Sequence, residues 1–240
     1  MPLPTINESI MYQKLLLPSG KNINIRGWKV KEEKELLFAS EKLEDNDIEK
    51  AKLIAKFLKS CIEDKTIADN LSETDLKKLA IELRKISKGD EVEYTAVCTA
   101  EKCKFKEDDV MKLSSVEMIK MFDLSPLNVN DDLILAFKDI SLDQSIELRK
   151  RFEKEPAKLI FYYLINSIEA VTFKGETYLN FTEKEMEEFI DQLNPNDLNK
   201  IYNEFEKKIS SVKIVKRNVC KKCGSESIIE IEDVLGFLIL

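Results

Sequence analysis

The spacing of apolar residues switches repeatedly between the three- and four-residue steps of a helix and the two-residue alternation of a strand. Helical spacing is clear where Ile48, Ala51, Ala55, Leu58 and Ile62 recur, which predicts a helix with one core face. The same reasoning predicts helices over residues 29–43, 48–62, 72–89, 141–154 and 156–168, and two more that begin at Thr182 and Asn194.

Three of these helices carry a start signal. In each, a hydroxyl residue is followed three positions later by an acid or an amide, which is the arrangement of a capping box. The pairs are Ser72 with Asp75, Ser141 with Gln144, and Thr182 with Glu185.

Alternating apolar residues predict strands between the helices. We expect a hairpin over residues 15–25, with Ile23 and Ile25 on its buried side, and a smaller hairpin over residues 171–178. Further strands are predicted at residues 91–97, 133–137 and 211–219. Only six glycines and six prolines occur, which disfavours a turn-rich all-β fold and favours helices.

The chain divides into three parts by this pattern. Residues 1–14 are expected to be a leader, and residues 15–125 an N-terminal helical domain with a hairpin and a first cysteine pair. Residues 126–240 are expected to be a C-terminal helical domain with a second cysteine pair and an apolar tail. The short polar stretch 126–132 is the candidate linker.

Composition limits the classes of partner. The chain has 240 residues, of which 43% are hydrophobic, so it can bury real cores. Its 45 acidic and 38 basic residues give a formal net charge of −7, which argues against a nucleic-acid duplex or an anionic membrane as main partner. No apolar run approaches the length of a bilayer span, and no signal peptide is recognisable. We therefore expect the chain to lie in the cytosol, where thiols stay reduced.

Four of the five cysteines form two short pairs, Cys98 with Cys103 and Cys220 with Cys223. Zinc takes four soft ligands in a tetrahedron, and two thiolates a few residues apart can bind one ion from a tight turn. Gly224 supplies backbone freedom at the second turn. Because the chain has no histidine, a closed site must be all-sulfur or must borrow a carboxylate. One structural zinc is the favoured interpretation, with free thiols or a disulfide as alternatives.

The cysteine pairs and their flanking strands have the form of a zinc ribbon divided between distant parts of the chain. The predicted fold class is therefore α+β and mainly helical, with short β-hairpins and a split zinc-ribbon-like β element. Such an ion would be structural, since four thiolates leave no open coordination position. We interpret the fifth cysteine, Cys61, as a buried hydrophobe.

The last seven residues include six apolar side chains and no charge, which is unusual for a chain terminus. We expect them either to contact a partner or to form the last strand of the protein's own core. The candidate partner-binding residues are Val234, Leu235, Phe237, Leu238, Ile239 and Leu240.

Two further functions are considered. A basic cluster around the second cysteine pair suggests a zinc-ribbon nucleic-acid-binding protein, although the rest of the chain is acidic and the cluster holds no aromatic residue for base stacking. Its members are Lys213, Lys216, Arg217, Lys221 and Lys222. An enzyme is disfavoured, because the chain has no histidine and no phosphate-binding glycine loop.

Several segments also occur in a characteristic order. The turn Leu17–Lys21 precedes an acidic helix start at Lys31–Leu37, and the segments Leu71–Leu76 and Leu83–Gly89 then precede the first cysteine pair. Together with the helices over 189–205 and the final Cys220-Lys221-Lys222-Cys223-Gly224, this order resembles the T-even-type bacteriophage baseplate hub assembly family. The four-residue gap between Cys98 and Cys103 is longer than the family's.

The resemblance implies a non-enzymatic assembly factor or minor component of the contractile-tail baseplate hub. Such a protein acts by binding phage baseplate hub proteins. It implies a location in the host cytoplasm during phage assembly, with the virion baseplate as a second location, and leaves the oligomeric state open.

Overall fold

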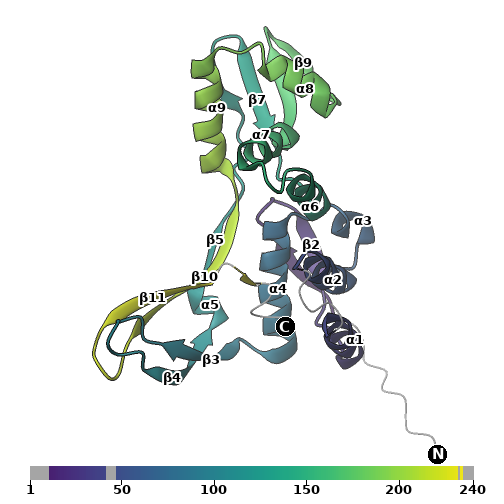
Figure 1. Ribbon diagram of the computed structural model, residues 1–240. Coiled ribbons are helices and arrows are strands. Elements are labelled where there is room, and N and C mark those ends of the chain that lie inside the picture. The colour runs from purple at the N-terminus through teal and green to yellow at the C-terminus, as the bar shows by residue number, and fades with distance from the viewer. Residues whose placement is uncertain (1–10, 42–46, 232, 235–240) are drawn as a thin grey trace, which may run out of the picture.

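The computed structural model describes residues 11–41, 47–231 and 233–234. Figure 1 shows a helical N-terminal lobe, two β-hairpins beside it, and a second lobe at the far end of a pair of strands. Helix makes up 43% and strand 27% of the structure. The fold is therefore mixed helix and strand with small sheets, and the prediction that it is mainly helical is not confirmed.

The N-terminal lobe (residues 11–88) packs helices against a β-hairpin. Its elements are β1 (Gln13–Leu16), β2 (Asn22–Ile25), α1 (Val30–Ser40), α2 (Asp47–Ser60), α3 (Lys65–Ala68) and α4 (Glu73–Lys88). Strands β1 and β2 pair antiparallel, and Ile23 and Ile25 are buried as predicted. Cys61 is also buried in this core, as predicted. Residues 1–10 of the expected leader lie outside the described residues.

The polypeptide then forms the first cysteine hairpin from β3 (Glu91–Val97) and β4 (Lys106–Lys112), followed by α5 (Leu113–Val116) and β5 (Glu117–Lys120). The second cysteine hairpin, β10 (Ser211–Val219) and β11 (Glu226–Ile231), comes from the end of the chain. Strand β10 pairs on its other side with β5, so the sheet order is β11-β10-β5.

The inserted lobe (residues 122–209) lies between β5 and β10 in the sequence. Its elements are β6 (Leu127–Asn128), β7 (Leu133–Phe137), α6 (Leu142–Arg151), α7 (Pro156–Ser167), β8 (Ile168–Phe173), β9 (Glu176–Tyr178), α8 (Glu183–Ile190) and α9 (Pro195–Lys208). The strands form an antiparallel sheet in the order β6-β7-β8-β9. The stretch 126–132 thus carries an edge strand, and Leu127 and Val129 are buried in the lobe's core.

Helix α6 docks the inserted lobe onto the N-terminal lobe (Figure 1). Its Leu142 and Ile146 belong to the core of the N-terminal lobe, and the Leu142 amide donates a hydrogen bond to the Leu71 carbonyl at 2.9 Å. Arg149 pairs with Glu73 at the start of α4. The two lobes therefore contact each other away from the strands that connect them.

The predicted start signals are confirmed. Capping boxes are present at α4, α6 and α8, because each hydroxyl accepts from the third backbone amide and the third side chain accepts in return. The Asp75 carboxylate at α4 also accepts hydrogen bonds from the Ser19 amide and hydroxyl, which ties the first hairpin turn to this helix.

Candidate metal centre

The four paired cysteines lie at the tips of the two cysteine hairpins. Each hairpin places its first cysteine at the end of a strand, where the cysteine amide donates across the tip. The Cys98 amide donates to the Phe105 carbonyl at 2.8 Å, and the Cys220 amide donates to the Ser225 carbonyl at 3.0 Å. The two tips are therefore built alike, although their sequences differ in length.

The residue after the second cysteine has a positive φ in both tips. Gly224 has φ 73°, as the sequence reasoning required, and Lys104 has φ 48°. A left-handed residue lets the chain turn back immediately into the next strand. The first tip holds two more residues than the second between its cysteines. The longer first tip nevertheless closes with the same kind of amide-to-carbonyl bond and the same left-handed residue as the second.

The sulfur atoms converge from both hairpins. Cys98 Sγ lies 3.7 Å from Cys223 Sγ, and Cys103 Sγ lies 3.8 Å from Cys220 Sγ. All four sulfurs lie within 4.8 Å of one another. Metal–sulfur bonds of about 2.3 Å in a tetrahedron put neighbouring sulfurs about 3.8 Å apart. The four cysteines predicted to act together are thus brought together, and the two shortest distances between the hairpins match those around one tetrahedral ion.

Ser225 is a member of this cluster that sequence reasoning missed. Its Oγ lies 3.3 Å from Cys98 Sγ and 3.2 Å from Cys223 Sγ. A hydroxyl that donates to a thiolate stabilises the charged form, so Ser225 lowers the pKa of Cys223 to about 6 and also lowers the pKa of Cys98. The sequence feature that could have identified Ser225 is its position two residues after Cys223.

The pKa of Cys103 moves the opposite way. A backbone hydrogen bond at Phe105 favours its thiolate, but burial and the three neighbouring sulfurs outweigh that bond and raise the pKa to about 11. Negative charges this close disfavour one another. A cation beside the cluster would favour the thiolate of Cys103.

Ion pairs join the two hairpins below the cysteines. Lys216 Nζ of β10 lies 2.6 Å from Asp109 Oδ2 of β4 and 4.8 Å from the centre of the Tyr94 ring. Lys221 Nζ lies 2.7 Å from Glu107 Oε2. These contacts hold the hairpins side by side without involving the sulfur atoms.

The same contacts bear on the predicted basic cluster. Lys213 pairs with Glu230, so three of its five members take part in ion pairs. Charge that is already neutralised by a carboxylate attracts phosphate weakly. The arrangement therefore gives no support to the nucleic-acid alternative.

The apolar tail falls mostly outside the described residues, since Leu235, Phe237, Leu238, Ile239 and Leu240 are not among them. Val234 has no exposed surface and packs in one cluster with Ile81, Val116 and Ile214. This residue therefore fits the interpretation in which the start of the tail belongs to the core.

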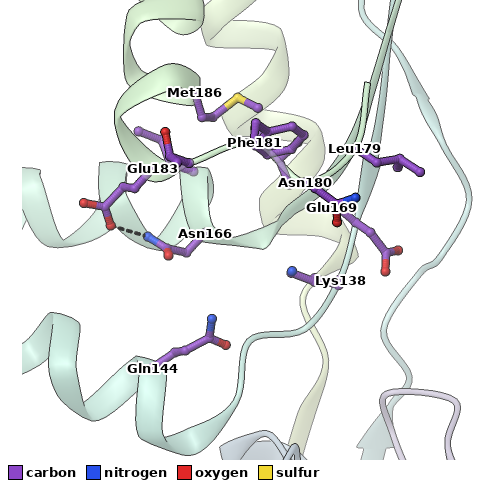
Figure 2. Close-up of a pocket in the computed structure, with 12 residues that line it drawn as sticks. Lys138, Gln144, Asn166, Glu169, Leu179, Asn180, Phe181, Glu183 and Met186 are labelled. Carbon is purple, nitrogen blue, oxygen red and sulfur yellow. Dashed lines mark hydrogen bonds between the residues drawn. The ribbon is translucent and has the colours of Figure 1, made fainter. Parts of the chain in front are cut away.

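A hollow of about 430 Å³ lies in the inserted lobe near α6 and α8 (Figure 2). Lys138, Gln144 and Asn166 lie on one side and Phe181 and Met186 on the other. The Asn166 side chain donates to Glu183 Oε2 at 2.9 Å, and Glu183 also pairs with Arg151. Its lining contains no thiol and no histidine.

No helix in the described part of the chain combines the length and the apolar character needed to cross a bilayer.

The family model for the T4 bacteriophage base plate protein matches residues 10–239. The chain belongs to this family, as the order of its motifs predicted. No curated protein and no solved structure matches the chain.

Proposed function

We propose that this member of the base plate family is a non-enzymatic hub assembly factor or minor hub component that works by binding other baseplate proteins. The observation that carries the proposal is the family match, which extends over nearly the whole chain. As an assembly factor, the protein acts in the host cytoplasm while the baseplate assembles. As a minor hub component, it also remains in the baseplate of the virion.

One structural zinc ion completes the proposed binding scaffold. Cys98, Cys103, Cys220 and Cys223 would hold it, and a thiolate set with no histidine or carboxylate suits zinc. When bound, the ion supplies a fixed link between the two hairpins. The sulfur separations of 3.7 and 3.8 Å favour this assignment over a disulfide, whose sulfurs are about 2.0 Å apart.

The zinc proposal is tested on the purified, reduced full chain. Elemental analysis is expected to find one zinc per chain in the wild type and none in a Cys220→Ser/Cys223→Ser variant. Cys61→Ala is the matched control and should retain the ion, because Cys61 is buried in a different core. A wild type purified from zinc-supplemented cells without bound metal would refute the site.

We propose that the apolar tail forms part of the surface that contacts a hub protein. Support comes from its composition, with Leu235, Phe237, Leu238, Ile239 and Leu240 lacking any charge. Because Val234 is buried, the proposed contact is limited to the residues that follow it.

The function is tested by mixing the full chain with each baseplate subunit of the same phage and following complex formation by gel filtration. We expect one subunit to bind, and a chain truncated after Val234 to lose that complex while keeping its circular dichroism and melting temperature. A large fall in melting temperature would instead assign the tail to the core. Binding to none of the subunits would contradict the proposed function.

A further inference from the structure

A hollow of about 430 Å³ opens between α2, α3 and the start of α6 on the N-terminal lobe. Its floor is formed by the small side chains of Ala55 and Ala68, both buried. Its rim is formed by charged side chains, which are Lys52, Lys56, Lys59, Lys65, Asp69 and Asp143. Four lysines thus face two aspartates, in a chain whose formal net charge is −7.

The sequence builds this rim from one face of a helix. Lys52, Lys56 and Lys59 follow one another at steps of four and three residues, so they project from the same side of α2. Lys65 begins α3 opposite them. Ala55 on this face of α2 and Ala68 on α3 leave the centre open, because any longer side chain there would fill it.

The positive charge on this rim is cancelled only in part, because two of the four lysines pair with carboxylates. Lys65 Nζ donates to the carbonyl oxygens of Lys59, Ser60 and Ile62, which carry no formal charge. Lys59 Nζ is 3.9 Å from Asp143 Oδ2, at the limit of an ion pair. Lys52 pairs with Glu49 at 3.1 Å. Lys56 is exposed and makes no ion pair with any residue that the structure describes.

We propose that this lysine-rimmed hollow is a docking site for an acidic segment of a partner protein, with carboxylates against the lysines and one apolar side chain over the alanine floor. Charge complementarity carries the assignment, since the hollow is positive on a negative protein. A longer polyanion such as duplex DNA would extend beyond the hollow and meet that negative field. The identity of the partner as a baseplate protein rests on the proposed function.

The probe is a short fluorescent peptide, Gly-Asp-Glu-Leu-Glu-Asp-Gly, titrated into the full chain and followed by anisotropy. We expect saturable binding at low salt that weakens as salt rises. Lys52→Glu/Lys56→Glu should weaken binding about tenfold or more, and Lys52→Gln/Lys56→Gln should weaken it less. Lys31→Glu/Lys34→Glu, on exposed positions of α1, makes the same charge change and should leave binding unchanged.

The location is checked by amide shifts of the isotope-labelled protein, which should cluster at Ala55, Ser60 and Ala68. Equal binding by both charge-reversed variants, shifts elsewhere, or no binding at low salt would each overturn the proposal. A duplex oligonucleotide that binds the same lysines more tightly than the peptide would also overturn it. If a baseplate subunit binds the wild type and the Lys52→Glu/Lys56→Glu variant equally, the proposed function stands and this docking site falls.

Discussion

The Nζ atom of Lys208 lies 3.0 Å from Oδ2 of Asp123, and this contact joins the points at which the chain leaves and enters the inserted lobe. The same ammonium donates to the Ser125 carbonyl at 2.7 Å and to the Ser125 hydroxyl at 2.9 Å, and the Asp123 amide donates to the Lys208 carbonyl at 3.0 Å. The lysine side chain is only 7% exposed. It therefore closes the base of the inserted lobe.

Lys208→Met should destabilise the protein. Methionine keeps the aliphatic stem but removes three hydrogen bonds of a buried ammonium, so we expect the free energy of unfolding to fall by about 1–3 kcal/mol. Urea unfolding measures the loss, and hydrogen exchange at residues 122–125 and 209–210 should quicken. Lys207→Met is the matched control, because Lys207 is exposed and pairs only at the surface with Glu204. An equal loss of unfolding free energy in both variants would contradict the role of Lys208 in closing the base of the inserted lobe.

Glu117→Gln should weaken the contact between α4 and β5. Glu117 and Glu82 alternate with Lys78 and Lys85 in a four-membered cluster whose nitrogen–oxygen distances are 2.6–3.3 Å. Removing one charge leaves two lysines facing one carboxylate in a half-buried site, at a cost of about 1–3 kcal/mol. Glu35→Gln, which breaks an exposed pair with Lys31, should cost less than about 0.5 kcal/mol.

This cluster also has a pH dependence. Burial alone would raise the pKa of Glu82, but Lys78 and Lys85 outweigh burial and hold it below the ordinary value of 4.5. The stability that this group contributes is therefore present above pH 4.5 and is lost as the pH falls through the lowered pKa. Chemical unfolding across the acid range should show a smaller acid-dependent loss in Glu82→Gln than in the wild type.

Asp139→Asn should stabilise the protein at neutral pH. Burial raises the pKa of Asp139 above 3.8; Asp75 adds to the rise, whereas Ser210, Ser72 and Lys21 oppose it. The folded state then binds the proton more tightly than the unfolded state, so stability falls as the pH rises from 3.8 through the raised value. The amide of the variant is never ionised, so the melting temperature of the variant should exceed that of the wild type by a margin that grows as the pH rises. A gain that is the same on both sides of this window would point to packing instead.

A zinc chelator should lower the melting temperature of the wild type and should not alter that of Cys220→Ser/Cys223→Ser. The ion would link residues near 100 to residues near 220, so its removal frees both hairpin tips. The ion pairs of Lys216 and Lys221 stay in place, so the helical signal should persist. Differential scanning fluorimetry with and without chelator measures the effect. Loss of the helical circular dichroism signal on chelation would show that the ion stabilises the helical lobes as well as the two hairpins.

Local signals were readable from the sequence. The Ser72–Asp75 and Ser141–Gln144 pairs predicted helix starts correctly, because a capping box depends on residues three positions apart. The strand over 211–219 was also predicted with its observed bounds. The four cysteines could be grouped because a metal needs several ligands of one kind, whichever way the chain folds.

Long-range relationships were not readable. Strand β4 begins Lys106-Glu107-Asp108-Asp109, so its first two inward positions, Glu107 and Asp109, are charged and give no apolar signal. They pair with lysines more than a hundred residues away, a relationship that the short strand-like stretch expected after Cys103 does not reveal. The pairing of β5 with β10 likewise joins segments about ninety residues apart in sequence. The position of α6 on the N-terminal lobe depends on Leu142 and Ile146 finding a core outside their own lobe.

Strand β10 runs without interruption from the base of the inserted lobe to Cys220. Because β5 enters that lobe opposite the point where β10 leaves it, a pull on the lobe would put both strands under tension in the same direction, and β10 would carry the load to Cys220. The cysteine cluster at the far end of β10 would then serve as a mechanical anchor.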